Sequence, residues 1–324
     1  MSQPVVEHKP IAFYEYPLSV DMLRIPNVKE ESISQELPYG SIHMKHWCFD
    51  GIRIGFTSHR FNDHFYFEKT NDPDVVNLEF NLKGNYTIHQ QGQVYDVRSQ
   101  QHNIVYSPGH HNTFRNGDLH TETFVVQFTP EIFLRIIEDS NRVLKRFAER
   151  MMDGKPAVLA QESLFINPEL QRTIHDVLNC RFTGGLKKMF LLSKSIEILV
   201  LQAEAYDRAF RNKDLYCKRK DDQERIMFAR DYLIQHVDMP PNLSELSKKA
   251  GINEYKLKRG FKEMFNATVF GYLSDYRLDR AREALLDDRK TISEIAYDLG
   301  YASPQHFSNA FRKKFGITPR DAKS

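Results

Sequence analysis

Two short segments near the C-terminus carry side chains that can hydrogen-bond to the edges of DNA bases. Arginine can present two donors to one guanine, and glutamine or asparagine can pair bidentately with adenine. Tyrosine can contact a thymine methyl group or donate to a phosphate. The candidate base-contacting residues are Tyr255, Lys258 and Arg259 in the first segment, and Gln305, His306 and Asn309 in the second. These side chains could read duplex DNA if the two segments form helices that fit a DNA groove.

Basic residues stand beside both groups. They are Lys262 in the first segment and Arg312, Lys313 and Lys314 in the second. We expect them to contact phosphates, which gives affinity and salt dependence without sequence choice. An alternative stays open for Arg259, which could bind a phosphate, and for the second segment, which could contact mainly the DNA backbone.

The surrounding pattern predicts that each segment is the second helix of a helix-turn-helix unit. A short helix with apolar residues at helical spacing comes first, with Ala250 or Ala296 where two helices must approach. A glycine follows, Gly251 or Gly300, which can adopt the positive φ that ends a helix. In the second helices the rows Leu257–Phe261–Phe265 and Phe307–Phe311–Phe315 should be buried. Ser303 and Pro304 suit the N-cap and first position of the last of these helices.

Residues 223–324 resemble the DNA-binding domain of the AraC/XylS family of bacterial transcription regulators. The resemblance rests on Ile292–Ala296, Gly300-Tyr301, Phe307-Ser308, Phe311–Gly316 and Thr318-Pro319. It implies seven helices in which one long helix, here Thr268–Leu286, bridges the two units. It also implies base contacts at Tyr255 and Arg259. Two recognition helices held this way could enter successive major grooves, which lie roughly 34 Å apart on one face of B-DNA.

Length and composition fit a two-domain protein. The 324 residues carry a net charge of +2, but residues 218–324 hold 21 Lys and Arg against 16 Asp and Glu, a net of +5, which leaves −3 for the rest. No run of eighteen apolar residues and no signal peptide is visible, so a soluble cytoplasmic protein without membrane contact is expected. Cys48, Cys180 and Cys217 are too widely spaced for a zinc or redox motif.

The first two hundred residues predict a separate β-rich domain. Residues 1–40 are expected to form an irregular lead-in, and 41–210 an antiparallel, sandwich- or barrel-like effector-binding and dimerisation domain that ends in a helix pair. Residues 211–222 are the expected linker, and 223–324 the all-α domain, so the fold class is α+β. The expected strands include 52–57, 75–82, 86–88, 103–106 and 121–128.

Helices are expected at 131–138, at 167–179 with Asn167 as N-cap, and at 186–210. The last of these carries an apolar stripe that is wide enough to pack against a neighbour or a second subunit. The stripe consists of Met189, Leu192, Ile196, Leu199, Val200 and Ala203.

Asn179–Leu199 is similar to the helix pair in the branch of the family that contains the pyochelin and yersiniabactin siderophore regulators. The resemblance implies a small-molecule effector, with a ferric siderophore as the candidate, and activation of promoters together with RNA polymerase. It also implies a homodimer as a candidate state. The residues that bind the effector cannot be named from the sequence.

Other functions receive less support from the residues. His102, His110, His111 and His120 lie close together in the sequence, but the chain has no His-x-His pair, which argues against a cupin-like metal-dependent enzyme. Catalytic residues, metal ligands and cofactors are therefore not expected. An architectural DNA-binding protein without an effector would not need the β-rich domain. A DNA-repair adaptor would need a reactive cysteine near the DNA-binding domain, and Cys217 is the only candidate at that place in the sequence. Trp47 and Phe65–Phe67 are expected to be core residues rather than the lining of a ligand pocket.

Overall fold

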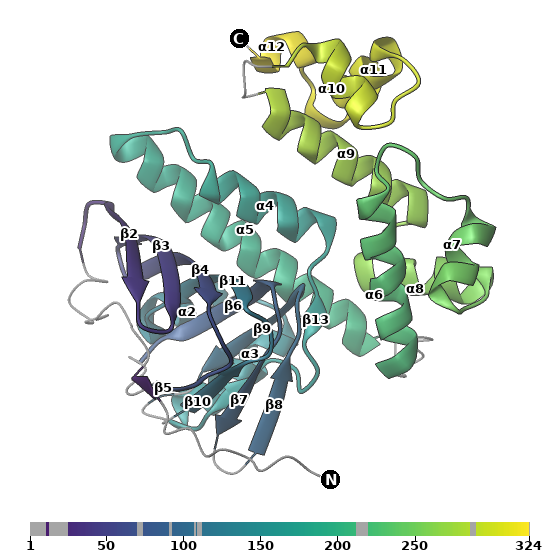
Figure 1. Ribbon diagram of the computed structural model, residues 1–324. Helices are drawn as coiled ribbons and strands as arrows, with labels where there is room; N and C mark the ends of the chain where they lie inside the picture. The colour runs from purple at the N-terminus through teal and green to yellow at the C-terminus, as the bar shows by residue number, and fades with distance from the viewer. Residues whose placement is uncertain are drawn as a thin grey trace. The chain divides into compact units, whose positions relative to one another are not determined.

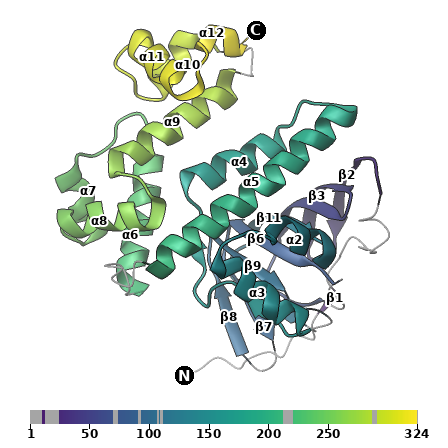
Figure 2. The same cartoon turned by 180° about the vertical axis from the view of Figure 1, so that it is seen from behind.

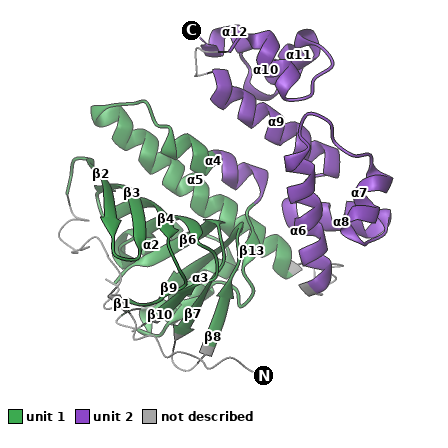
Figure 3. Cartoon of the chain, viewed as in Figure 1, with its two compact units in different colours: residues 1–166, 173–211 green, residues 167–172, 212–324 purple. Residues whose placement is uncertain are grey.

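A computed structural model describes residues 11–12, 25–69, 74–90, 93–106, 108, 112–211, 220–285 and 290–323. The chain divides into two compact units (Figure 3). Unit 1 contains residues 1–166 and 173–211, and unit 2 contains residues 167–172 and 212–324. Unit 1 is a β-rich domain with helices and unit 2 is helical, so the expected α+β fold class is confirmed.

The larger sheet of unit 1 is antiparallel and has the strand order β12-β9-β6-β11-β4-β3-β2, with β13 also paired to β9 (Figure 1). Two-residue turns make neighbours of β2 and β3 and of β3 and β4. The strands are β2 (Lys29–Leu37), β3 (Gly40–Phe49), β4 (Ile52–Phe61), β6 (Val76–Lys83), β9 (Gln101–Tyr106), β11 (His120–Phe128), β12 (Ala157–Val158) and β13 (Leu164–Phe165).

The smaller sheet has the order β1-β5-β10-β7-β8. Its strands are β1 (Ile11–Ala12), β5 (Tyr66–Lys69), β7 (Tyr86–Gln90), β8 (Gln93–Val97) and β10 (Asn112–Asn116). The ring of Phe67 on β5 lies 5.3 Å from that of Phe61 on β4, so the two sheets meet at this corner. This arrangement agrees with the expected sandwich- or barrel-like domain.

One face of the larger sheet is the apolar core of unit 1. Trp47, Ile54, Leu78 and Phe124 share this face and are at most 1% exposed. Helices α2 (Pro130–Ile137), α3 (Arg142–Met152) and α5 (Gly184–Arg211) cover it, and Figure 2 shows α2 and α3 from the side on which they lie. Trp47 and Phe67 are core residues, as expected, whereas Phe65 and Tyr66 are half-buried.

Strand β2 corrects the expectation that residues 1–40 are irregular. Lys29–Leu37 pairs with β3 along its whole length, from Lys29 opposite Cys48 to Leu37 opposite Gly40. Its sequence is mostly polar because it is an edge strand whose side chains are largely exposed. Backbone pairing with the long strand β3, rather than an alternating apolar pattern, therefore holds it in the sheet.

The helices between Pro130 and Arg211 follow the expectation with one addition, since α3 was not predicted. Asn167 Oδ1 accepts the amide of Leu170 at 2.8 Å, so it caps helix α4 (Pro168–Leu178) as expected. The apolar stripe of α5 divides between two faces. Leu199 and Ala203 are buried against the sheet, whereas Met189, Leu192, Ile196 and Val200 are 36–67% exposed.

Unit 2 is built from seven helices within the described residues. They are α6 (Lys220–Gln235), α7 (Leu243–Ala250), α8 (Glu254–Phe265), α9 (Val269–Leu285), α10 (Ile292–Asp298), α11 (Pro304–Phe315) and α12 (Pro319–Lys323). Helix α6 begins at Lys220, three residues before the expected start, and residues 212–219 of the expected linker lie outside the described residues. The buried rows agree with the expectation at five positions: Leu257, Phe261, Phe265, Phe307 and Phe311 are fully buried. Phe315 packs beside Phe311 but is only half-buried.

Candidate nucleic-acid interface

The first helix-turn-helix unit consists of α7 and α8, and its ends are fixed by local hydrogen bonds. Asn242 caps α7 in a reciprocal pair with Glu245, in which each side chain accepts the other residue's backbone amide. Gly251 ends α7 with φ +66°. Asn253 Oδ1 then accepts the amide of Lys256 at 2.8 Å and starts α8. The turn is thus defined on both sides, which sets the direction of α8.

The second unit, α10 and α11, repeats this design. Thr291 and Glu294 form the reciprocal cap of α10. Gly300 follows α10 with φ +74°, and a Cβ at this position would lie 2.3 Å from the carbonyl oxygen of Asp238. Ser303 caps α11 and Pro304 is its first residue, as expected. The turn before α11 therefore requires glycine for its φ angle and for the close approach of another backbone segment.

Helix α9 connects the two helix-turn-helix units within unit 2, as the resemblance implied for residues 268–286. Its residue Arg277 joins parts of both: Nε donates to the carbonyl oxygen of Val237, before α7, at 2.9 Å. The same guanidinium lies 5.6 Å from the ring centroid of Tyr301, before α11. Tyr301 in turn packs on Phe307. The Arg277 side chain therefore helps to hold the second helix-turn-helix unit in position relative to the first.

Helix α8 buries one side and exposes the other. The expected base-contacting residues are exposed. Tyr255 as a whole residue is 56% exposed, and the side chains of Lys258 and Arg259 are 63% and 46% exposed. Lys262 is also exposed. Arg259 Nη1 donates to the Tyr255 hydroxyl at 2.9 Å, and Nε lies 3.4 Å from Glu263 Oε1. The hydrogen bond with Tyr255, followed by that with Glu263, raises the pKa of Arg259, so the guanidinium is held as a charged group on the outer face of α8.

Helix α11 presents Gln305, His306 and Asn309 on its exposed face, with Arg312 and Lys313 beside them. Phe307 and Phe311 occupy the opposite, buried face. The helix thus separates a polar outer surface from an aromatic inner one, as a groove-binding helix requires.

Lys314 departs from the expectation that it contacts phosphate. Its side chain is 9% exposed and turns toward α9, where Nζ lies 2.8 Å from Asp279 Oδ1 and 3.1 Å from Asp275 Oδ1. Nζ also donates to the carbonyl oxygen of Asp275 at 2.8 Å. Because three acceptors surround its ammonium group, Lys314 connects α11 to α9 and does not face the solvent with the expected DNA-contacting residues. Asp275 and Asp279 lie on α9, so the sequence around Lys314 gives no signal of this contact.

Within the described residues of unit 1, no group of three His, Cys, Asp or Glu side chains is arranged to hold a metal ion. His102 Nδ1 lies 3.0 Å from Gln202 Nε2, and Tyr206 Oη donates to the His102 carbonyl oxygen at 2.7 Å. His120 Nε2 lies 3.0 Å from Glu122 Oε1. His110 and His111 lie outside the described residues, as does Cys217. Among the helices that the structure describes, none is long and apolar enough to cross a membrane.

Two helix-turn-helix units on one bridging helix, joined to a β-rich domain, define the class of DNA-binding transcription regulators with a separate N-terminal regulatory domain. The comparisons with known proteins agree. Residues 40–214, more than half of the chain, match the family model "Regulatory protein PchR N-terminal domain". Residues 246–324 match the model "Helix-turn-helix domain".

The protein belongs to the AraC family of helix-turn-helix regulators and carries the N-terminal domain of the PchR type. It is a DNA-binding transcription regulator and not an enzyme.

Individual relatives cover parts of the chain. It is 36% identical over 126 residues to "Regulatory protein PchR" of Pseudomonas aeruginosa, a match that spans 38% of this chain and 42% of that protein. It is 35% identical over 99 residues to "Regulatory protein SoxS" of Salmonella typhimurium, spanning 31% of this chain and 92% of SoxS. Among solved structures, an AraC-type regulator from Chromobacterium violaceum is 28% identical, with a TM-score of 0.30, over 32% of this chain and 94% of that one.

Proposed function

We propose that this regulator reads promoter DNA with α8 and α11 in successive major grooves. The observation that supports this most directly is that α8 and α11, which both belong to unit 2, are built in the same way. Each exposes a polar face at the end of a capped turn, and α9 and Arg277 link the two. Helices joined in this way can present two reading surfaces to one side of the duplex.

In this proposal the residues divide by chemistry. Tyr255, Lys258 and Arg259 on α8 contact base edges, where the guanidinium leaves Tyr255 and Glu263 to pair with guanine. Gln305, His306 and Asn309 on α11 contact the second groove. The phosphate-contacting residues are Lys262, Arg312 and Lys313, and Lys314 is left out of this set because α9 holds its ammonium group.

We propose further that a small molecule bound by unit 1 sets the activity, and that the effector is a ferric siderophore. The support is the match of residues 40–214 to the PchR-type domain together with the similarity of Asn179–Leu199 to siderophore regulators. On this reading the protein acts in the cytoplasm, activating promoters through RNA polymerase. Repression would require the bound protein to block the polymerase, which the same DNA contacts would allow.

A homodimer through α5 belongs to the same proposal, with a second copy of the chain as the partner. Met189, Leu192, Ile196 and Val200 repeat at three and four residues and form one exposed apolar row on a helix of 28 residues. Two such rows can pack against each other in a self-complementary interface. Val200→Glu should then lower the mass measured by sedimentation, whereas Glu204→Gln, one turn further along α5, should not. An unchanged mass in Val200→Glu would contradict this dimer.

Genome-wide mapping of binding sites in iron-poor and iron-replete cells tests the main proposal. Arg259→Ala should lower the occupancy of discrete sites, and Lys155→Ala, an exposed lysine of unit 1, is the matched control. Iron-dependent occupancy near siderophore or receptor genes would support the effector. Sites that are weakened in Arg259→Ala but do not respond to iron would contradict the siderophore only. The absence of discrete sites in the wild type would contradict the DNA-reading proposal.

A further inference from the structure

Helices α8 and α11 begin in the same register. The N-caps Asn253 and Ser303 each accept a hydrogen bond from the amide of the third helical residue. That residue is Lys256 in α8 and His306 in α11, and the residue after it is fully buried in both helices. Lys256 therefore occupies the position that His306 has in α11, in the N-terminal part of a recognition helix, which contacts DNA.

The ammonium group of Lys256 is already paired within unit 2. Its Nζ lies 3.1 Å from Oδ2 and 3.2 Å from Oδ1 of Asp222, which stands in the first turn of α6. The side chain of Asp222 is 15% exposed and that of Lys256 is 36% exposed. Two oxygens of one carboxylate thus face the lysine, in the way that two oxygens of a DNA phosphate would.

The packing of α6 keeps the Asp222 carboxylate beside α8. Arg225 is three residues further along α6 and so lies on the same side of the helix. Its Nη1 donates to the carbonyl oxygen of Gly251, in the turn between α7 and α8. Ile226, in the same helical turn, is 1% exposed. A short aspartate side chain on a helix that is fixed in this way has little room to leave Lys256.

We propose that Asp222 is an internal counter-ion that keeps Lys256 away from the DNA backbone and limits the affinity of α8 for DNA of any sequence. An unpaired lysine at this position would neutralise a phosphate and release a bound cation, which strengthens binding to all sequences alike. The ion pair removes that charge, whereas Tyr255 and Arg259 remain available for base edges. This role of Asp222 rests on the proposed placement of α8 in the major groove and identifies a residue that restrains unselective binding.

Exchange of the Asp222 carboxylate for a DNA phosphate brings Lys256 no net gain in charge neutralisation. If Nζ moved to the DNA, Asp222 would stay close to the backbone as an uncompensated negative charge. Salt would screen the repulsion between this carboxylate and the phosphates only in part, because the Debye length is about 8 Å at physiological ionic strength. The net charge of this part of unit 2 is the same before and after the exchange, so the ion pair persists at the DNA.

Salt titration of binding between the full-length protein and a duplex of random sequence tests this role. Asp222→Asn frees Lys256, so the slope of log K against log salt should become steeper by about 0.9. Affinity at physiological ionic strength should rise roughly fivefold, which follows from that slope. The double variant that combines Asp222→Asn with Lys256→Met should return to the wild-type slope, because the pair of side chains is then neutral again.

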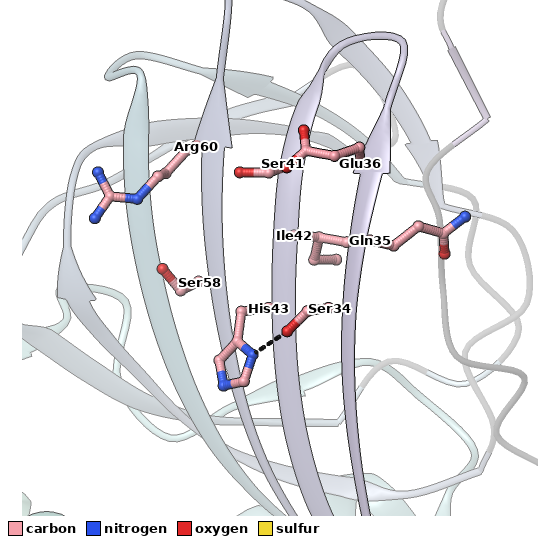
Figure 4. A pocket seen from close by; sticks show the side chains of 8 residues that line it. All are labelled: Ser34, Gln35, Glu36, Ser41, Ile42, His43, Ser58 and Arg60. Carbon is pink, nitrogen blue, oxygen red and sulfur yellow. Dashed lines mark hydrogen bonds between the residues drawn. The ribbon is translucent and has the colours of Figure 1, made fainter.

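Two variants control for the change in net charge alone. Asp221→Asn and Glu36→Gln raise the net charge by the same amount as Asp222→Asn. Asp221 is the exposed neighbour on α6. Glu36, in unit 1, lines an open hollow of about 300 Å³ together with Ser41 and Arg60 (Figure 4). Both variants should keep the wild-type slope, and so should Asp222→Glu, which retains the carboxylate.

An unchanged slope in Asp222→Asn would overturn the role of Asp222. A steeper slope that persists in the double variant, or that appears equally in Asp221→Asn, would overturn it as well. Partial unfolding cannot mimic the expected result, because it lowers affinity, and Asp222→Ser is a second way to remove the carboxylate. The proposed function is tested separately by Lys262→Ala, whose slope should be shallower than that of the wild type. No change in Lys262→Ala would count against the placement of α8 at the DNA.

Discussion

At the scale of single residues, the outer face of α8 separates two kinds of contact. Arg259→Ala should reduce affinity for the best site about tenfold and relax base preference at one position, because a bidentate pair carries sequence information. Lys262→Ala should instead weaken binding to all sequences alike and lower the slope of log K against log salt by about 0.9, since one phosphate contact is lost. Selection from a randomised DNA pool and salt titration measure the two effects. A uniform loss in Arg259→Ala would assign that residue to phosphate.

Lys314 and Lys313 form a matched pair on α11 with different surroundings. Lys314→Met leaves the carboxylates of Asp275 and Asp279 next to each other without the lysine between them. Burial is the largest effect on Asp279 and raises its pKa, so the negative charge of Asp279 is already unfavourable at this position. We expect a loss of about 1–2 kcal/mol in the stability of unit 2, between the values for exposed and buried pairs. Lys313→Met should leave the thermal midpoint unchanged and lower the salt slope of DNA binding. The reverse pattern would place Lys314 at the DNA.

At the scale of elements, the turn before α11 depends on Gly300. Gly300→Ala puts a side chain at φ +74° and a Cβ 2.3 Å from the Asp238 carbonyl oxygen, so α10, α11 or the preceding backbone must shift. The expected cost is about 3 kcal/mol or more, combining backbone strain with the clash. Gly316→Ala is the control, because its φ is +76° with no atom within 4 Å of the added Cβ. It should cost only about 1 kcal/mol. Equal losses by calorimetry would refute the role of close packing at Gly300.

The same elements explain what the sequence could predict. Gly251, Gly300 and Ser303 act through their own backbone conformation or side-chain cap, so their roles were predictable from local chemistry. Strand β2 is held by pairing with β3, and its mostly polar sequence gives no alternating signal. Lys314 looked like a phosphate contact because only the packing of α11 on α9 brings Asp275 and Asp279 to it.

The polar face of β4, which carries Arg53, Thr57 and His59, was also missed in the sequence. Arg53, Thr57 and His59 do alternate with Ile52, Ile54 and Phe56, a pattern that assigns them to the other face of β4. The pattern could not show that this second face lies opposite another sheet rather than in water. That information comes from the packing of Phe67 on Phe61, which joins segments from both sheets.

At the scale of the whole molecule, buried histidines make the stability of unit 1 depend on pH. Burial lowers the pKa of His102 to about 3 and that of His59 to about 4. In the unfolded chain both return to about 6.5. Below that value the unfolded state therefore binds protons that the folded state does not, and stability falls as the pH falls. Above pH 7 both histidines are neutral in either state and contribute no slope.

Urea unfolding followed by the fluorescence of Trp47, the single tryptophan of the chain and a core residue of unit 1, measures this effect. Between pH 6.5 and 5 the contribution of these two histidines to the slope should approach about 2.7 kcal/mol per pH unit, since each proton contributes about 1.36 kcal/mol. His102→Gln should remove about half of it, because glutamine can keep a hydrogen bond to Gln202 without titrating. A slope of the same size in His102→Gln would mean that other groups carry the pH dependence. Because His102 joins β9 to α5, the loss of stability in acid should also loosen the helix that carries the proposed dimer surface.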